Sequence, residues 1–343
     1  MNYFIAFAIF TIILFLYIHV IAEYGRSEDL EIYEMDYIDN KQFQEVCNIK
    51  QPVLFEFKSF EPELFNNLTI SSIANITNDE IKIIDLNDYW KSKDAVEYIT
   101  VPFQTANKLM ETDINAHFFT EHNDIFMDEN NISSKLKALD HYFKPYSTIQ
   151  TKMDLIMGSK GCTLPLRYHT DYRHLVGVTS GKIHIKMTPW KSTKYLSPIK
   201  DYETYEFRSA INVWNPQQKY LHEMDKLKFL EFDILEGHIL FIPAYWWYSI
   251  KYSDEPASTA FTCTYNTFIN RIANISDIGL HILQQHNITE KITKTLNTND
   301  DTSENVNNTN IVDNQKQSEN NAIPTSQSNL DIPLQQSAIE STL

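Results

Sequence analysis

The longest run of apolar positions lies at the start of the chain. Residues 3–22 contain no side chain with a formal charge, and a polar run over residues 23–28 ends the stretch. About 20 apolar residues are what a helix needs to cross the ~30 Å hydrocarbon layer of a bilayer. We therefore expect residues 1–22 to form an N-terminal transmembrane anchor, which makes the protein a single-pass membrane protein that contacts lipid through residues 3–22.

The orientation of this segment stays open, because Arg26 is the only basic residue near it and the positive-inside rule has little to act on. A cleaved signal peptide is the alternative, since Val20 and Ala22 suit a small-residue cleavage site before Glu23. The absence of Lys and Arg ahead of the apolar stretch speaks against cleavage. A buried core helix is the third interpretation.

The central part of the chain shows the patterns of a folded, mainly β domain with flanking helices. Apolar residues have helical spacing over residues 101–119 and 132–143. Short apolar or alternating runs predict strands over residues 51–57, 81–86, 164–168, 175–179, 182–187, 230–234, 238–242, 246–252 and 259–267. Such strands, separated by turns, are typical of an antiparallel sandwich or barrel.

The outer segments give the domain its expected bounds. We expect a linker over residues 23–40, the domain over residues 41–285, and a closing helix over residues 278–286. From residue 286 to 343 the sequence is dominated by Asn, Ser, Thr and Gln, without apolar periodicity. Such a segment buries too little surface to offset its chain entropy, so we expect it to be a disordered tail.

Composition excludes several classes of function. The net charge of −16 and the absence of a basic stripe argue against a nucleic-acid partner. With 7 glycines, the chain has neither a dinucleotide-binding glycine motif nor a P-loop. The three widely spaced cysteines form no disulfide framework and favour a reducing compartment. The Asn-rich, Gly-poor composition is typical of AT-rich genomes, such as those of large DNA viruses or protists.

One short motif carries metal chemistry. His169 and Asp171 form a His-x-Asp pair at the end of a predicted strand, where residues i and i+2 share a face. This is how two arms of a 2-His-1-carboxylate site for Fe(II) are supplied. The pair alone is a weak signal.

The surrounding sequence strengthens that signal. A turn at Gly181 leads into an apolar strand that a proline ends. A later run begins at Glu236 and ends in Ile242-Pro243-Ala244-Tyr245-Trp246-Trp247. Residues 51–266 thereby resemble the cupin-like, JmjC-type family of double-stranded β-helix proteins, which includes asparaginyl hydroxylases and histone demethylases. The resemblance implies a jelly-roll barrel and, in active members, Fe(II) and 2-oxoglutarate.

Two positions depart from the family pattern. Tyr248 stands where the family has its second metal-binding histidine, and Ile183 stands where many members have the lysine that pairs with 2-oxoglutarate. Lys182 is adjacent, but its side chain should point to the opposite face unless a bulge shifts the register. A neutral phenol is a poor Fe(II) ligand. We therefore expect a vestigial or partial metal set of His169, Asp171 and Tyr248, without an assigned catalytic residue.

Other side chains offer alternatives at this site. His174 and His184 are candidate replacement ligands, and Tyr248 is expected to hydrogen-bond to His169 in an emptied pocket. Tyr168, Trp246 and Trp247 are expected at the pocket or in the core beside it. We expect no cofactor, or Fe(II) and 2-oxoglutarate if the chain is active, with Lys182 as the fallback partner of the co-substrate.

Three functions remain open from sequence. The first is a membrane-anchored, catalytically degenerate cupin-like protein with a binding role. The second is an active Fe(II)/2-oxoglutarate-dependent hydroxylase with an altered metal site. The third is a membrane-associated scaffold whose tail recruits a protein partner. The substrate and the oligomeric state are not determined by the sequence.

Overall fold

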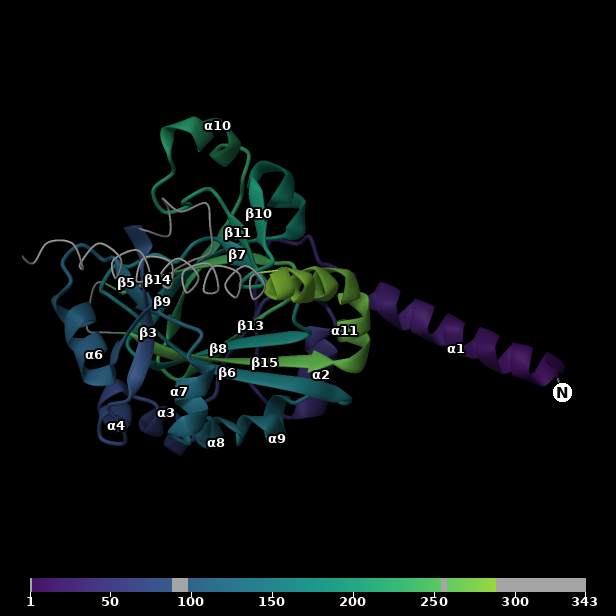
Figure 1. Cartoon of the computed structure of the whole chain (residues 1–343), viewed down its shortest axis with the longest axis horizontal. Coiled ribbons are helices and arrows are strands. Elements are labelled where there is room, and N and C mark those ends of the chain that lie inside the picture. The colour runs from purple at the N-terminus through teal and green to yellow at the C-terminus, as the bar shows by residue number, and fades with distance from the viewer. Residues whose placement is uncertain (1, 88–97, 254–257, 288–343) are drawn as a thin grey trace, which may run out of the picture. The chain divides into compact units, whose positions relative to one another are not determined.

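The computed structural model describes residues 2–87, 98–253 and 258–287 (Figure 1). Helix α1 (Asn2–Glu23) is exposed along its length, and its segment Tyr3–Glu23 has a mean hydropathy of 2.7 with no part buried. Length and composition allow this helix to cross a membrane, although a signal sequence would meet the same criteria. The predicted disordered tail falls on residues that, from 288 onward, lie outside the described part.

Two β-sheets form the body of the domain. The first has nine strands in the order β1 (Tyr33–Glu34), β2 (Val53–Glu56), β13 (His238–Ile242), β8 (Arg173–Ser180), β15 (Thr259–Thr267), β6 (Thr148–Gly158), β5 (Phe118–Thr120), β3 (Glu80–Asp85) and β4 (Ile99–Pro102). The second has six, in the order β10 (Pro198–Asp201), β11 (Glu206–Ser209), β7 (Arg167–Tyr168), β14 (Trp247–Tyr252), β9 (Lys182–Thr188) and β12 (Leu230–Leu235).

The chain crosses repeatedly between these sheets. Strand β7 belongs to the second sheet, β8 to the first, β9 and β12 to the second, β13 to the first, β14 to the second and β15 to the first. This confirms the mainly β class with flanking helices. Within the described residues the sheets remain two separate sheets with their own edge strands, and they do not close into one barrel.

Helices cover the outer face of the nine-stranded sheet. Their buried side chains join those of β2, β6, β8, β13 and β15 in one apolar cluster that includes Phe43, Phe65, Phe103, Met127 and Phe143. The helices of this cluster are α2 (Asn40–Cys47), α3 (Pro62–Asn67), α4 (Ile70–Ala74), α6 (Phe103–Thr112), α7 (Asp124–Glu129), α8 (Ile132–Leu136) and α9 (Leu139–Phe143). Figure 1 shows α7, α8 and α9 beneath β6.

A second apolar cluster fills the space between the sheets. Strand β9 contributes Ile183, Ile185 and Met187, and their polar neighbours point outward because alternate residues face opposite sides. After β9 the chain forms the short helix η1 (Trp190–Tyr195), and after β11 it forms the short helices η2 (Gln218–Tyr220) and α10 (Leu221–Met224). The chain then returns through α11 (Phe268–Ala273) to a helix over residues 275–287.

Three local predictions need correction. The helix predicted over residues 101–119 ends at Thr112, because the Asp113 carboxylate accepts the backbone N–H groups of Asn115, His117 and Phe118 and turns the chain into β5. The helix over residues 132–143 is divided at Lys137 into α8 and α9. Strands β6, β10 and β11 were not predicted. The exposed positions of β10 and of the first half of β6 hide the alternation, whereas β11 is buried throughout but has a single apolar residue, Phe207.

The segment predicted as a linker is part of the fold. Its residues 33–34 form β1, which pairs with β2 in parallel register. Arg26 lies over the rings of Trp190 and Tyr245, at 4.3 Å and 4.2 Å from their centres. Helix α2 then begins at Asn40, capped by the Asp39 side chain. The closing helix was predicted correctly over residues 278–286, within the observed helix over residues 275–287.

Candidate functional site

The turn between β13 and β14 holds the His-x-Asp motif in place. His169 follows β7, and its Nε2 donates a hydrogen bond to the carbonyl oxygen of Ile242 at 3.1 Å. In return, the backbone N–H of Tyr245 donates to the carbonyl oxygen of His169 at 2.9 Å. Tyr245 has a left-handed backbone with φ of 66°, which lets the chain leave one sheet for the other here. The specific sequence run from Ile242 therefore positions the motif.

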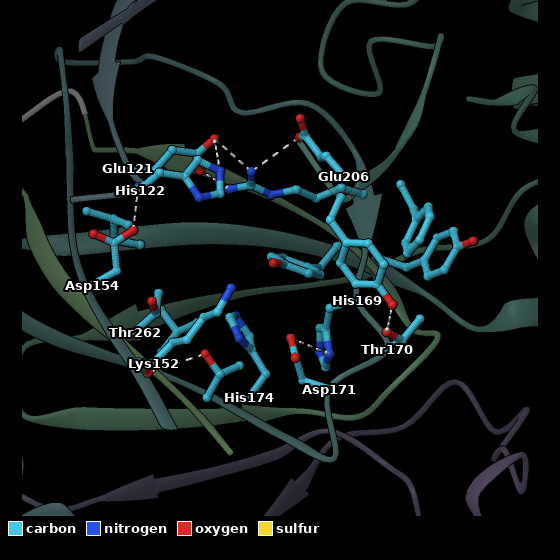
Figure 2. Close-up of a pocket in the computed structure, with 18 of the residues that line it drawn as sticks. Glu121, His122, Lys152, Asp154, His169, Thr170, Asp171, His174, Glu206 and Thr262 are labelled. Atoms are coloured by element: carbon cyan, nitrogen blue, oxygen red, sulfur yellow. Dashed lines mark hydrogen bonds and ion pairs between the residues drawn. The ribbon is translucent and has the colours of Figure 1, made fainter. Parts of the chain in front are cut away.

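A cavity of about 230 Å³ opens beside this motif (Figure 2). Strands β6, β8 and β15 supply one wall, and β7, β11 and β14 supply the other. His169, Asp171, His174, Tyr248 and Arg167 all line it. The structure thus brings together both parts of the motif, the tyrosine that departs from the family pattern, and one of the two candidate replacement histidines.

Two of the three histidines that line the cavity, His169 and His174, have unsatisfied nitrogens. The rings of His169 and His174 lie 4.6 Å apart between centres, and Nδ1 of each is buried without a hydrogen-bond partner among the described residues. Nδ1 of His169 lies 3.8 Å from Oδ2 of Asp171, while Oδ1 of Asp171 accepts a hydrogen bond from Asn266 at 2.7 Å. Burial lowers the pKa of His169, and it lowers the pKa of His174 well below its ordinary value, so both rings are neutral near pH 7.

Tyr248 does not bond to the motif. Its ring centre lies 6.1 Å from that of His169 and 5.8 Å from that of His174, and the hydrogen bond expected between Tyr248 and His169 is not formed. Burial raises the pKa of the Tyr248 phenol to about 12, although the nearby Arg167 cation opposes that shift. The phenol is therefore neutral, and it presents a donor rather than an anionic oxygen to the cavity.

A buried charge network lies above the motif. Arg167 contacts Glu121 through two hydrogen bonds of 2.9 Å and 2.5 Å and approaches Glu206 at 3.4 Å. Burial opposes the charge of Arg167, but the two carboxylates keep its pKa well above the ordinary value. The same network holds the pKa of Glu121 below its usual value despite burial.

The sequence interpretation missed this network. Arg167 stands two residues before His169, so the i, i+2 rule that grouped His169 with Asp171 also places Arg167 on that face. Its partners carry no such signal, because Glu121 and Glu206 come from segments 46 and 39 residues away.

Several predicted residues lie elsewhere. Lys182 points outward, where its Nζ lies 3.5 Å from Asp233, and it is not among the residues lining the cavity. His184 also pairs with Asp233 on this outer face. Register explains both, since Ile183 between them faces the core. The fallback roles of Lys182 and His184 therefore find no support in this geometry.

The aromatic residues divide between the cavity and the core. Tyr168 lines the cavity and packs edge-on against Trp247, with ring centres 4.8 Å apart. Trp247 is buried, and its indole N–H donates to Thr193 at 2.8 Å. Trp246 is also buried, and it donates to the carbonyl of Lys50 at 3.1 Å. The tryptophans thus anchor the turn in the core instead of lining the cavity.

The residues present do not fit Fe(II) and 2-oxoglutarate. Within the described residues, no group of three His, Cys, Asp or Glu side chains is arranged to hold a metal ion. The third ligand position holds a neutral phenol, and the co-substrate position holds the buried, apolar Ile183. Iron at this site would lack one ligand, and 2-oxoglutarate would lack the lysine of the family pattern, although Lys152 and Arg167 also line the cavity.

Sequence comparison finds related proteins for this region. Residues 74–271 match the family described as "Cupin-like domain". Two similar proteins are "HSPB1-associated protein 1" from Bos taurus, 25% identical over 214 residues, and its Homo sapiens counterpart, 24% identical over 214 residues. Each match covers 62% of this chain, but 37% of the bovine and 36% of the human protein. The chain therefore spans little more than a third of these relatives.

Proposed function

This chain belongs to the cupin-like domain family, and we propose that it is a membrane-anchored member whose cavity binds a ligand without Fe(II)/2-oxoglutarate chemistry. Fold alone does not decide activity, since similar folds host oxygenases, isomerases and binding proteins. The proposal therefore rests on the side chains of the cavity.

Tyr248 carries this proposal. A phenol whose pKa is raised to about 12 offers a metal no anionic oxygen near pH 7, and its ring lies 6.1 Å from His169 with no bond between them. The cavity nevertheless keeps two buried imidazole nitrogens that lack partners. Unsatisfied buried polar atoms cost about 1–3 kcal/mol each, so a ligand that completes their hydrogen bonds would be stabilised there.

The proposed anchor is α1. Its side chains are exposed, and its apolar length matches the hydrocarbon thickness of a bilayer. An exposed apolar helix whose single charged side chain is its last residue, Glu23, is unfavourable in water, which supports a lipid environment for it.

The absence of oxygenase chemistry is tested by titrating the purified chain with Fe(II) and 2-oxoglutarate under anaerobic conditions. We expect no saturable heat in calorimetry, and no succinate or carbon dioxide after oxygen is admitted. Tight iron binding together with steady turnover of 2-oxoglutarate would contradict the proposal.

An active oxygenase with an altered site is the second candidate. The observation in its favour is His174, whose ring lies 4.6 Å from that of His169 and whose Nδ1 has no partner. If this candidate is right, the wild-type chain takes up metal and the His174→Ala variant does not. Equal metal content in the wild type and the variant would rule out His174 as the replacement ligand.

A protein partner is the third element of the proposal. The two relatives are named for an association with HSPB1, which makes partner binding a reasonable expectation for the shared region. We expect affinity capture to recover the same partner with the full chain and with a chain that lacks residues 288–343. Loss of the partner on this deletion would assign binding to the tail instead of the cupin-like domain.

A further inference from the structure

The helix over residues 275–287 attaches to the domain through its polar face. Asp277, His281 and Gln285 are spaced by four residues and so share one face. Asp277 accepts a hydrogen bond from Tyr202 at 2.7 Å, His281 contacts the carbonyl of Tyr202 at 2.7 Å, and Gln285 donates to the carbonyl of Glu203 at 2.5 Å. The turn between β10 and β11 is thus the docking site of the polar side chains.

Three large apolar side chains of this helix point away from that docking site and are uncovered. Ile275, Ile282 and Leu283 are exposed by 67%, 61% and 63%. A helix on a soluble domain normally buries its apolar residues against the domain, whereas here polar residues make that contact and these three apolar residues stay exposed. An exposed apolar stripe of this kind marks an interaction surface.

The candidate anchor ends beside this helix. Tyr24, the first residue after α1, donates a hydrogen bond from its hydroxyl to the carbonyl of Ala273, two residues before Ile275. Two residues later, Arg26 lies over the rings of Trp190 and Tyr245. Phe268, at the start of α11, adds another exposed apolar side chain at 53%. Figure 1 shows α11 next to the end of α1.

We propose that the helix over residues 275–287 lies in the interface of a lipid bilayer, with Ile275, Ile282 and Leu283 inserted among the lipids. This inference rests on the proposed membrane anchor, because a spanning α1 would bring its end, and α11 beside it, to the membrane surface, and the helix over residues 275–287 follows directly on α11. Interfacial helices bury their apolar face about 5–10 Å deep, which suits a single stripe of Ile and Leu. The domain would then be held at the bilayer in one orientation instead of hanging from a loose linker.

The buried cysteines make a direct test practical. Cys47, Cys162 and Cys263 are free and buried, so a thiol-reactive fluorophore on the folded chain will label an introduced, exposed cysteine selectively. We would label full-length Ile282→Cys and, as the matched control, Ile114→Cys. Ile114 is 94% exposed in the loop between α6 and β5, which Figure 1 shows away from α11.

Each labelled chain is reconstituted into phosphatidylcholine vesicles with and without nitroxide-labelled lipid. We expect the nitroxide to remove most of the fluorescence at position 282 and almost none at position 114. Alkaline carbonate extraction of the same vesicles reports separately on the anchor. A chain that resists extraction but is unquenched at position 282 would overturn the interfacial helix and leave the anchor intact.

Other occupants of the apolar stripe give different outcomes. If a second copy covers it, Ile282→Cys chains will form an intermolecular disulfide in detergent, and position 282 will stay unquenched in vesicles. If residues 288–343 cover it, their deletion will be needed before position 282 is quenched. Either result overturns the proposal. Release of the chain by carbonate would remove its premise together with the proposed anchor.

Discussion

Arg167 and Tyr248 lie opposite each other in the register of β7 and β14, with the guanidinium carbon 5.9 Å from the centre of the Tyr248 ring. Arg167 is already paired with Glu121 and Glu206, so its charge is balanced by protein carboxylates. Tyr248 completes this wall as a neutral, buried ring. At the position where the family pattern has a metal-binding histidine, this chain therefore has a buried tyrosine that packs against the Arg167 network.

Removing Arg167 should destabilise the domain strongly. Arg167→Met leaves the buried carboxylates of Glu121 and Glu206 without their cation, and breaking one side of a buried pair typically costs ~3–5 kcal/mol. Urea unfolding followed by tryptophan fluorescence measures the loss. Lys58→Ala is the matched control, because the Lys58–Glu236 pair is exposed and such pairs contribute ~0–1 kcal/mol. An equal loss of unfolding free energy in the two variants would contradict the stabilising role of the buried Arg167 network.

Stability should fall as the pH is lowered through the range of histidine titration. Burial lowers the pKa of both His169 and His174 in the folded chain, so below about pH 6.5 the unfolded chain binds protons that the folded chain does not. The histidine contribution is therefore fully present above pH 6.5 and is lost as the pH falls toward the folded pKa values. Urea unfolding at a series of pH values between 7.5 and 5 measures this slope.

Replacing one histidine should flatten that slope. His174→Gln removes one of the two groups, so its free energy of unfolding should change less between pH 7.5 and 5 than that of the wild type. His222→Gln changes an exposed residue of α10 and serves as the control. A slope unchanged by His174→Gln would show that this ring is already protonated in the folded chain.

The segment after α1 should contribute measurable stability. Arg26 lies over two aromatic rings, and partly buried cation–π contacts are worth ~0.5–2 kcal/mol. We expect Arg26→Ala to lower the free energy of unfolding by about 1–2 kcal/mol, with Arg26→Lys in between. Lys219→Ala, which removes an exposed cation over the single ring of Tyr220, should have a much smaller effect. A neutral Arg26→Ala variant would mean that this segment is only loosely attached.

The mature chain should keep its N-terminal helix. Intact mass of the protein purified from membranes should include residues 1–22, and Ile13→Arg should reduce its membrane fraction, because a charge at the centre of a span costs ~2.5–3.5 kcal/mol on insertion scales. A mass that begins at Glu23 would instead identify a cleaved signal peptide.

How far the sequence predicts this fold depends on how locally each feature is encoded. Strand β9 was predicted closely because Ile183, Ile185 and Met187 alternate with polar residues. Strand β10 is exposed and short, so it carries no such alternation, and its place is set by pairing with β11. The turn after Thr112 was missed because it depends on backbone N–H groups gathered by the Asp113 side chain.

The residues of the candidate site also differ in how far the sequence predicts them. His169, Asp171 and Tyr248 were placed together from a motif and its family pattern, and the structure puts all three at one cavity. Lys182 was separated from it by the alternation of β9, which the sequence already indicated. The pairing of Arg167 with Glu121 and Glu206 joins distant segments and becomes visible only in three dimensions.

The iron content of Tyr248→His beside the wild type shows whether Tyr248 is the residue that keeps this cavity from binding Fe(II). Both chains, together with Tyr248→Phe as the control for loss of the hydroxyl, are loaded with Fe(II) anaerobically, desalted and analysed for metal. We expect Tyr248→His alone to retain stoichiometric iron, because the imidazole would complete a ligand set with His169 and Asp171. Stoichiometric iron in the wild-type chain would contradict it.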